Sequence, residues 1–328
     1  MLTYVIRRIL YMIPTVIIIS IIAFATIQAP PGDFLTSMLN QFQEQYGSAA
    51  QEQITILRDQ YGLDLPFIQQ YFLWITNIIF DGDFGRSFAE NRPVSDILIE
   101  RIPLTISITM VTLLFTWLVA VPIGVFSAVR QYSLLDYIFT LFAFIGCSIP
   151  NFLLALVLMY IFYEAFGWSL GGLFSTEYQA EPWSVGKVID LLQHMVLPII
   201  VIGTAGTASL VRVLRSLMLD ELGKQYVKTA RAKGLSERIV IWKHVFKIAV
   251  GPIVSTVGWL LPSLISGEMI TSIVLNLPTT GTAMYNALLN QDIYVSGAIV
   301  LIVSVFTVFG TLLSDILLAA LDPRIRYD

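Results

Sequence analysis

The chain has 328 residues, of which 56% are hydrophobic and 13% are charged, and its mean hydropathy is +0.76. A typical soluble domain carries about 25% charged residues, so these values exclude an ordinary water-soluble globule. The net charge of −4 argues against a nucleic-acid-binding protein, and the single cysteine excludes a disulfide framework or a cysteine-built metal site.

Uncharged stretches long enough to cross a membrane recur along the chain. A helix needs about 20 mostly apolar residues to span a hydrocarbon core of about 30 Å. Six stretches meet or approach this requirement, at 9–29, 102–129, 137–163, 195–211, 248–275 and 293–314. The sequence therefore predicts an all-α polytopic membrane protein with six transmembrane helices and both termini on one side.

The first stretch has two interpretations. Arg7 and Arg8, the apolar run and the Ala23-Phe24-Ala25 sequence are also the pattern of a cleavable signal peptide. Apolar character continues past that position, so we expect an uncleaved first helix within residues 1–29.

Residues 30–101 are too many for a simple connection and predict an extracytoplasmic subdomain. Residues 51–61 are compatible with a short helix, and residues 67–80 have the apolar spacing of a helix that is too short to span a membrane comfortably. Residues 81–87, with the sequence DGDFGRS, predict a turn in which glycine supplies positive φ.

Residues 102–328 contain the other five apolar stretches and predict a five-helix core. Residues 164–190, rich in glycine and tryptophan, predict an irregular cap at the membrane surface. Small residues recur over 203–209 inside the fourth stretch, which favours close packing of that helix against its neighbours.

Lysine and arginine predict the orientation of the chain. With both termini inside, 14 of the 19 basic residues fall in inner segments, and residues 212–247 alone hold nine basic residues against three acids. The opposite topology would invert this rule, so the sequence predicts that the N- and C-termini are both inside.

The inner loop at 216–247 predicts a short amphipathic helix. Asp220 and Glu221 are expected to cap its N-terminus, and Gly234 is expected to end it. Its apolar residues recur every four positions, and its small residues, including Ala230 and Ala232, permit close approach by another molecule. The alternative interpretation is a basic stretch that meets anionic lipid.

Residues 226–235, with the sequence YVKTARAKGL, resemble the EAA loop of permeases in binding-protein-dependent ABC importers. The variant is that of the dipeptide, oligopeptide and nickel transporter group. The resemblance covers nearly the whole chain, because further segments are similar to the B-type subunit in the same order: 4–10, 82–87, 148–152 and 322–327.

This resemblance implies a type I ABC importer permease fold in the plasma membrane of a bacterium or archaeon. It implies several partners: a second homologous permease subunit, two ABC ATPases that bind ATP and magnesium, an extracytoplasmic substrate-binding protein and membrane lipid. The chain itself is expected to be a non-catalytic subunit without a cofactor or metal, and it lacks the phosphate loop G-x-x-x-x-G-K-[ST]. Peptides are the implied cargo, with oligosaccharides or nickel complexes as alternatives.

The resemblance also implies which residues couple the permease to the ATPases. They lie in the EAA-type loop and are Glu221, Tyr226, Lys228, Thr229, Ala230, Arg231, Ala232, Lys233 and Gly234. Among them, Lys228, Thr229 and Ala230 occupy the positions at which other permeases carry Glu-Ala-Ala.

Glu268 lies deep in the fifth apolar stretch, where a charge costs roughly 2.5–3.5 kcal/mol on insertion scales. We expect Glu268, Met269 and Ser272 to face the translocation pathway, and a structural hydrogen bond within the bundle is the alternative for Glu268. Ser272 stands where relatives often carry glutamate, and residues 275–281 lack the Pro-Gly-x-Gly pattern of many members. A secondary transporter is a remote alternative, because it would need several buried charges or broken helices.

Overall fold

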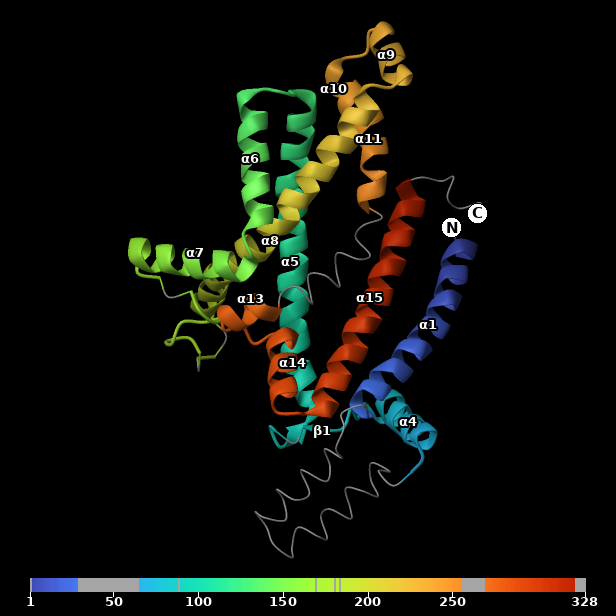
Figure 1. The fold of residues 1–328 in the computed structure, drawn as a ribbon, viewed down its shortest axis with the longest axis vertical. Helices are drawn as coiled ribbons and strands as arrows, with labels where there is room; N and C mark the ends of the chain where they lie inside the picture. Colours follow the sequence, from blue (N-terminus) through green and yellow to red (C-terminus); the bar gives the residue numbers. More distant parts are fainter. Residues whose placement is uncertain are drawn as a thin grey trace, which may run out of the picture. The chain divides into compact units, whose positions relative to one another are not determined.

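The computed structural model describes residues 2–28, 65–87, 89–168, 170–179, 181–182, 184–254 and 269–321. Four helices in these ranges are long and apolar enough to cross a membrane: Thr3–Thr26, Val94–Val129, Val185–Leu222 and Ile293–Ala320 (Figure 1). The prediction of a helical, multi-pass membrane protein is therefore confirmed for the described part of the chain.

The elements are named in chain order, with one short antiparallel strand pair among the helices. They are α1 (Leu2–Gln28), α4 (Phe67–Thr76), the π-helical turn η1 (Asn77–Asp81), β1 (Arg86–Ser87), β2 (Arg92–Pro93), α5 (Val94–Val129), α6 (Leu134–Ser148), α7 (Asn151–Phe166), α8 (Val185–Leu222), α9 (Gln225–Ala232), α10 (Glu237–Ile239), the π-helical turn η2 (Val240–Val245), α11 (Phe246–Ala249), α13 (Met269–Val274), α14 (Thr280–Leu289) and α15 (Ile293–Leu321).

The third apolar stretch, expected as one span over 137–163, forms two helices. α6 and α7 are bent by 108° across the break that contains Ile149 and Pro150. Proline lacks the N–H that a continuing helix needs, and its ring pushes the preceding residue into an extended conformation. Ile149 accordingly has φ −88° and ψ 123°. The prediction of one continuous helix was wrong. The described residues contain four helices long and apolar enough to span a membrane, or five candidate spans if the bent pair forms one.

The fourth apolar stretch, 195–211, lies inside the longer helix α8. That helix begins at Val185, where the Ser184 hydroxyl accepts a hydrogen bond from the Lys187 N–H at 3.2 Å. Residues 185–190, expected to be irregular, are therefore helical. The small residues of α8 pack closely, because a Cβ added to Gly203 would lie 2.7 Å from Phe115 of α5.

Two other sequence predictions concern shorter helices. The helix expected over 67–80 is confirmed as α4 followed by η1. The helix expected over 51–61 lies outside the described residues. So does the middle of the fifth apolar stretch, residues 255–268, although α11 and α13 flank this segment.

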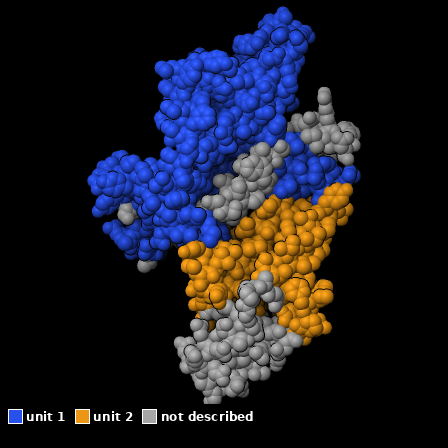
Figure 2. All heavy atoms as spheres, viewed as in Figure 1, with its two compact units in different colours: residues 1–8, 104–282, 309–328 blue, residues 9–103, 283–308 orange. Residues whose placement is uncertain are grey.

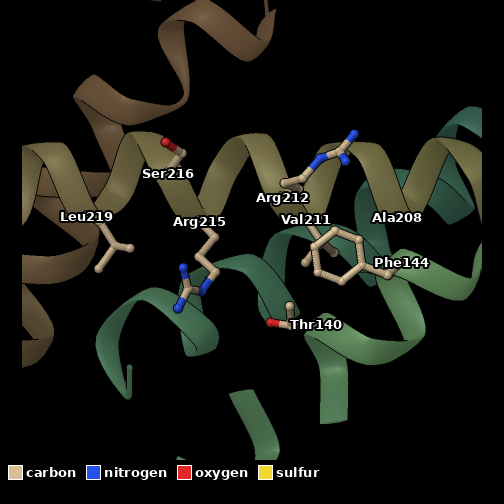
Figure 3. Close-up of a pocket in the computed structure, with 9 residues that line it drawn as sticks. Thr140, Phe144, Ala208, Val211, Arg212, Arg215, Ser216 and Leu219 are labelled. Atoms are coloured by element: carbon tan, nitrogen blue, oxygen red, sulfur yellow. The ribbon is translucent and has the colours of Figure 1, made fainter. Parts of the chain in front are cut away.

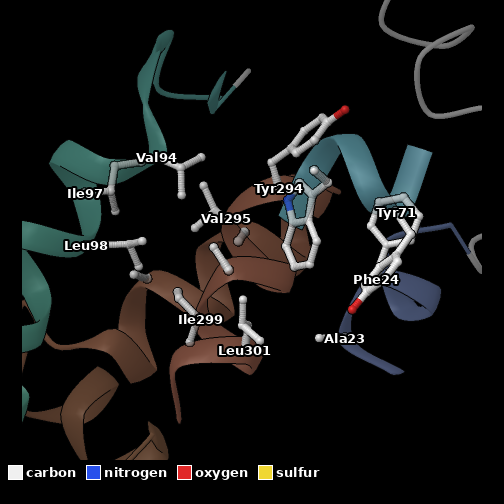
Figure 4. Close-up of a cluster of buried hydrophobic side chains, with 14 residues drawn as sticks. Ala23, Phe24, Tyr71, Val94, Ile97, Leu98, Tyr294, Val295, Ile299 and Leu301 are labelled. Carbon is white, nitrogen blue, oxygen red and sulfur yellow. The ribbon is translucent and has the colours of Figure 1, made fainter. Parts of the chain in front are cut away.

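The chain divides into two compact units (Figure 2). Unit 1 contains residues 1–8, 104–282 and 309–328, and unit 2 contains residues 9–103 and 283–308. In unit 2, buried apolar side chains of α1, α4, α5, α14 and α15 form one core (Figure 4). The ring of Phe24 lies 5.4 Å from that of Trp74 and 5.8 Å from that of Tyr71, so aromatic contacts join α1 to α4.

The DGDFGRS segment of unit 2 forms the predicted turn and the start of the hairpin β1–β2. Gly82 and Gly85 have positive φ values of 66° and 97°. The Ser87 hydroxyl donates to Asp292 Oδ2 at 2.5 Å, and the Ala89 N–H reaches the same oxygen at 3.3 Å. Because Asp292 directly precedes α15, these bonds attach the hairpin to the start of that helix.

Unit 1 contains two cores of buried apolar side chains. The first joins α5, α8, α9, η2 and α11, and includes Leu214, Met218, Val227, Val240 and Ile253. The second joins α5, α7 and α8 to the segment after α13, and includes Ile108, Ala155, Leu197, Val201 and Leu275. The first core contains the short helix α9, on which the functional prediction rests.

Candidate functional site

Helix α9 is eight residues long and has a well-defined stop. The Gly234 N–H donates to the Arg231 carbonyl at 2.9 Å, and the Leu235 N–H donates to the Ala230 carbonyl at 3.3 Å. These two bonds form a Schellman motif, which requires a left-handed residue at the position of Gly234. Gly234 has φ 76°, so the prediction that it ends the helix is confirmed.

The start of α9 differs from the prediction. Asp220 and Glu221 do not cap it, because they belong to the last turn of α8, and Lys224 occupies the N-cap position. Only residues 223 and 224 separate the two helices, so residues 220 and 221 still lie within α8. The N-cap prediction was wrong.

Glu221 instead joins the two helices. Its carboxylate accepts hydrogen bonds from the Lys224 ammonium group and, at 2.7 Å, from the Tyr226 hydroxyl. Burial and the hydrogen bond to Glu221 raise the pKa of Tyr226. The hydroxyl therefore remains protonated and donates to Glu221 across the physiological pH range. This hydrogen bond stabilises the bend between α8 and α9.

The two faces of α9 have different surroundings. Val227 and Ala230 face inward, with exposures of 0% and 7%, and pack in the core that contains Leu214 and Met218 of α8. The apolar stripe predicted from the sequence is thus covered by the chain itself. This packing makes α9 part of the same body as the end of α8.

The outer face of α9 and the turn after it are exposed. The exposed residues are Lys228, Thr229, Arg231, Ala232, Lys233 and Gly234. A Cβ added to Gly234 would meet no atom within 4 Å, so a larger side chain there would extend away from the rest of the chain.

Arg231 connects this face to the next helix. Its Nε and Nη2 atoms donate to the two carboxylate oxygens of Glu237 at 2.7 and 3.2 Å. The Glu237 carboxylate raises the pKa of Arg231. Both side chains are exposed, so the pair positions the turn more than it stabilises the fold.

An ion pair also joins α8 to α6. Arg215 Nε and Nη2 donate to Asp136 Oδ1 and Oδ2, both at 2.9 Å, and the Asp136 side chain is only 3% exposed. Figure 3 shows Arg215 directed from α8 toward α6, beside a cleft lined by Thr140, Phe144 and Val211. Two parallel hydrogen bonds therefore join α8 to α6 at this point.

Comparison with known proteins identifies the family. Residues 120–327 match the family described as the binding-protein-dependent transport system inner membrane component, and residues 1–109 match the family described as its N-terminal membrane component. The chain belongs to this family of importer permeases.

Relatives of the permease share its full length. It is 36% identical over 331 residues to the oligopeptide transport system permease protein AppB of Bacillus subtilis, and the match covers 100% of both chains. It is 31% identical over 328 residues to the oligopeptide transport system permease protein OppB of Haemophilus influenzae, again over 100% of both. The glutathione transport system permease protein GsiC of Salmonella typhi is 32% identical over 329 residues, with 100% of each chain covered.

The structure brings the loop residues predicted for this permease into one region, but it divides them between two roles. Ala230 and Glu221 are buried, and Tyr226 is partly buried, so these three hold α9 in place. The others are exposed. The residue types alone could not separate the roles, because the burial of Ala230 depends on α8 and η2.

The residues predicted to line a pathway are only partly described. Glu268 lies outside the described residues. Met269 is partly buried at the start of α13, and Ser272 is fully buried with no hydrogen-bond partner for its hydroxyl among the described residues.

Sequence reasoning missed three residues that build this region of the permease. They are Lys224, Glu237 and Asp136, whose side chains bind Glu221, Arg231 and Arg215. The first two could have been found from opposite charges three and six residues apart around the ends of α9. In the described parts of the permease, no group of three His, Cys, Asp or Glu side chains is placed to hold a metal ion.

Proposed function

We propose that this permease is the membrane-spanning subunit of an ATP-driven importer for peptides. The names of its relatives support the cargo, since AppB and OppB are named for oligopeptides and GsiC for glutathione. Oligosaccharides and nickel complexes are the alternative cargoes. An extracytoplasmic binding protein delivers the cargo, and a second homologous permease completes the pathway, which Glu268, Met269 and Ser272 line in this chain.

In this proposal α9 is the helix on which a partner ATPase acts. The observation that carries the proposal is the division of α9 into a buried inner face and an exposed outer face. A partner that binds the outer face moves α8 as well, because Val227 and Ala230 share a core with Leu214 and Met218. The Asp136–Arg215 pair then extends the movement to α6.

The mechanism is a change in the populations of two conformations. ATP binding closes the paired ATPases, and their closure displaces α9 as a rigid lever. ATP and magnesium bind to the ATPases, and this chain is non-catalytic.

The proposed topology has six spans with both termini inside, in a bacterial or archaeal plasma membrane. In this topology α9 lies on the cytoplasmic face, residues 30–101 lie outside, and residues 102–328 form the core.

The substitution Ala232→Trp tests the proposal. It adds a large side chain to the exposed outer face, so we expect the amount of ATPase that co-purifies with the permease to fall by about tenfold, a change of roughly 1.4 kcal/mol in binding. Leu192→Trp is the control, because Leu192 is also exposed but lies near the other end of α8. Equal ATPase recovery with both variants would exclude α9 as the docking helix, and transport by this chain alone would favour a secondary transporter.

A further inference from the structure

A cleft of about 230 Å³ lies in unit 1 between α6 and α8, where Arg215 reaches Asp136. Most of its lining is apolar and comes from both helices, with Ala143 and Phe144 on α6 and Val211 on α8. The cleft is too small to enclose a large molecule, but its apolar walls suit part of a hydrocarbon chain.

Two arginines line this cleft, and the chain neutralises only one of them. Arg215 donates through Nε and Nη2 to the Asp136 carboxylate, at 2.9 Å in both cases. Arg212, one turn earlier on α8, is exposed and has no ion pair or hydrogen bond among the described residues. No acidic side chain is among the residues that line the cleft. The lining therefore carries one positive charge that no described carboxylate compensates.

The uncompensated charge lies at the mouth of the cleft. Figure 3 shows Val211 and Arg215 directed toward α6, whereas Arg212 and Ser216 lie on the adjacent side of α8. Arg212 and Ser216 are both exposed, and side chains four residues apart on a helix are neighbours. The guanidinium group and the hydroxyl can therefore donate hydrogen bonds to the same anion.

The cleft also lies where hydrocarbon is expected to meet water. The apolar stretch at 195–211 ends directly before Arg212. On α6, large and mainly apolar side chains are exposed, with Tyr137 and Leu141 at 59% and Phe144 at 55%. An apolar surface followed at once by arginine is typical of the boundary between the bilayer core and the lipid headgroups.

We infer that this cleft binds a phospholipid with one net negative charge, such as phosphatidylglycerol. The phosphate accepts hydrogen bonds from Arg212 and Ser216 at the mouth, and the first methylenes of one acyl chain pack against Ala143, Phe144 and Val211. Basic pockets between helices on the cytoplasmic side recognise anionic headgroups in this way. The one uncompensated positive charge of the lining matches the one charge of the lipid.

Other ligand classes fit the cleft less well. A cation would face Arg212 without an acidic side chain in the lining. Phosphatidylcholine has the same phosphate but adds a quaternary ammonium group, for which the lining offers no carboxylate. A soluble phosphate ester would leave the apolar walls in contact with water.

The leaflet of this lipid rests on the proposed orientation, which places the mouth of the cleft on the cytoplasmic side. The binding itself depends neither on that orientation nor on the partner ATPases. A failure of the lipid test would therefore leave the proposed coupling function standing, and a failure of the ATPase test would leave the lipid result readable.

Native mass spectrometry of the full chain in detergent, titrated with phosphatidylglycerol, measures the dissociation constant of the first bound lipid. We expect Arg212→Gln to weaken this binding about fivefold, the contribution of one basic side chain near a membrane surface. Arg238→Gln is the matched control, because Arg238 is also exposed but does not line the cleft. Equal binding by Arg212→Gln and the unmodified chain, equal weakening by both variants, or equal binding of phosphatidylcholine would overturn the inference.

A second variant tests the apolar part of the cleft. Ala143→Phe fills space beside Phe144 and Val211, so we expect it to weaken phosphatidylglycerol binding at least as much as Arg212→Gln does. Leu141→Phe is the control, since Leu141 is exposed on the same helix and lies outside the lining. Unchanged binding by Ala143→Phe would show that the lipid does not enter the cleft.

Two further measurements distinguish other occupants. Displacement of the lipid by an equal concentration of glycerophosphoglycerol, its headgroup without acyl chains, would assign the site to a soluble phosphate ester and overturn the lipid inference. The titration is then repeated on the complex of this chain with its second permease subunit. Retention of the Arg212-dependent binding supports the inference, and its loss would show that the partner permease covers the cleft instead.

Discussion

Gly234 shows that one residue can be required for its backbone conformation and not for its small size. Its φ is 76°, yet a Cβ at this position would meet no atom within 4 Å. Residues other than glycine lose roughly 1–2 kcal/mol in the left-handed region, and asparagine loses less than most. The order of residues in the loop predicted this role because the motif that stops a helix is local.

Substitution of Gly234 by alanine should therefore loosen the end of α9. We expect Gly234→Ala to destabilise the helix by about 1 kcal/mol, and Gly234→Asn to destabilise it less. Hydrogen exchange at the backbone amides of α9 measures the effect. Gly251→Ala is the control, because its Cβ also meets open space but its φ is not positive. Similar exchange rates in Gly234→Ala and Gly251→Ala would contradict the conformational explanation.

At the scale of elements, α6 and α8 are joined by a contact that links distant parts of the sequence. Asp136 and Arg215 are 79 residues apart in the sequence. The hydropathy pattern predicted both helices, but it contains no information about which charged residues pair. The hydropathy pattern also does not indicate the break at Pro150, because the residues on both sides of the proline are apolar.

Loss of the charge on Asp136 should weaken the joint between the two helices. Breaking a fully buried ion pair costs about 3–5 kcal/mol, but the Arg215 side chain is 26% exposed, so we expect Asp136→Asn to cost about 2 kcal/mol. The melting temperature of the purified permease in detergent reports this loss. Arg212→Gln provides the comparison, because Arg212 lies on the same helix, is exposed and has no ion pair among the described residues. If the two variants melt alike, the pair does not hold α6 to α8.

At the scale of the whole molecule, the basic loop predicts the orientation in the membrane. In a Cys147→Ser background, a cysteine at position 228 should react with a membrane-impermeant maleimide only from the cytoplasmic side, and one at position 177 only from the opposite side. Both positions are exposed in the structure. Right-side-out and inverted vesicles provide the two measurements.

Ala230→Cys is the control for this experiment, because Ala230 is 7% exposed and its cysteine should react slowly from either side. Labelling of positions 228 and 177 from the same side would show that the orientation inferred from lysine and arginine is wrong.

The sequence by itself determined the features that depend on neighbouring residues. These are the apolar stretches, the excess of basic residues in one loop, the turn at 82–85 and the glycine that stops α9. Composition and short-range spacing decide such features, so they can be read without a structure.

Only the tertiary structure decided which surfaces are covered. It placed Ala230 in a core with α8, and it joined Ser87 to Asp292 across 205 residues of sequence. It also placed the Asp190 carboxylate beside His194, with 3.5 Å between Oδ1 and Nδ1. Burial and charge pairing depend on groups that meet only when the helices pack, and so no local pattern carries them.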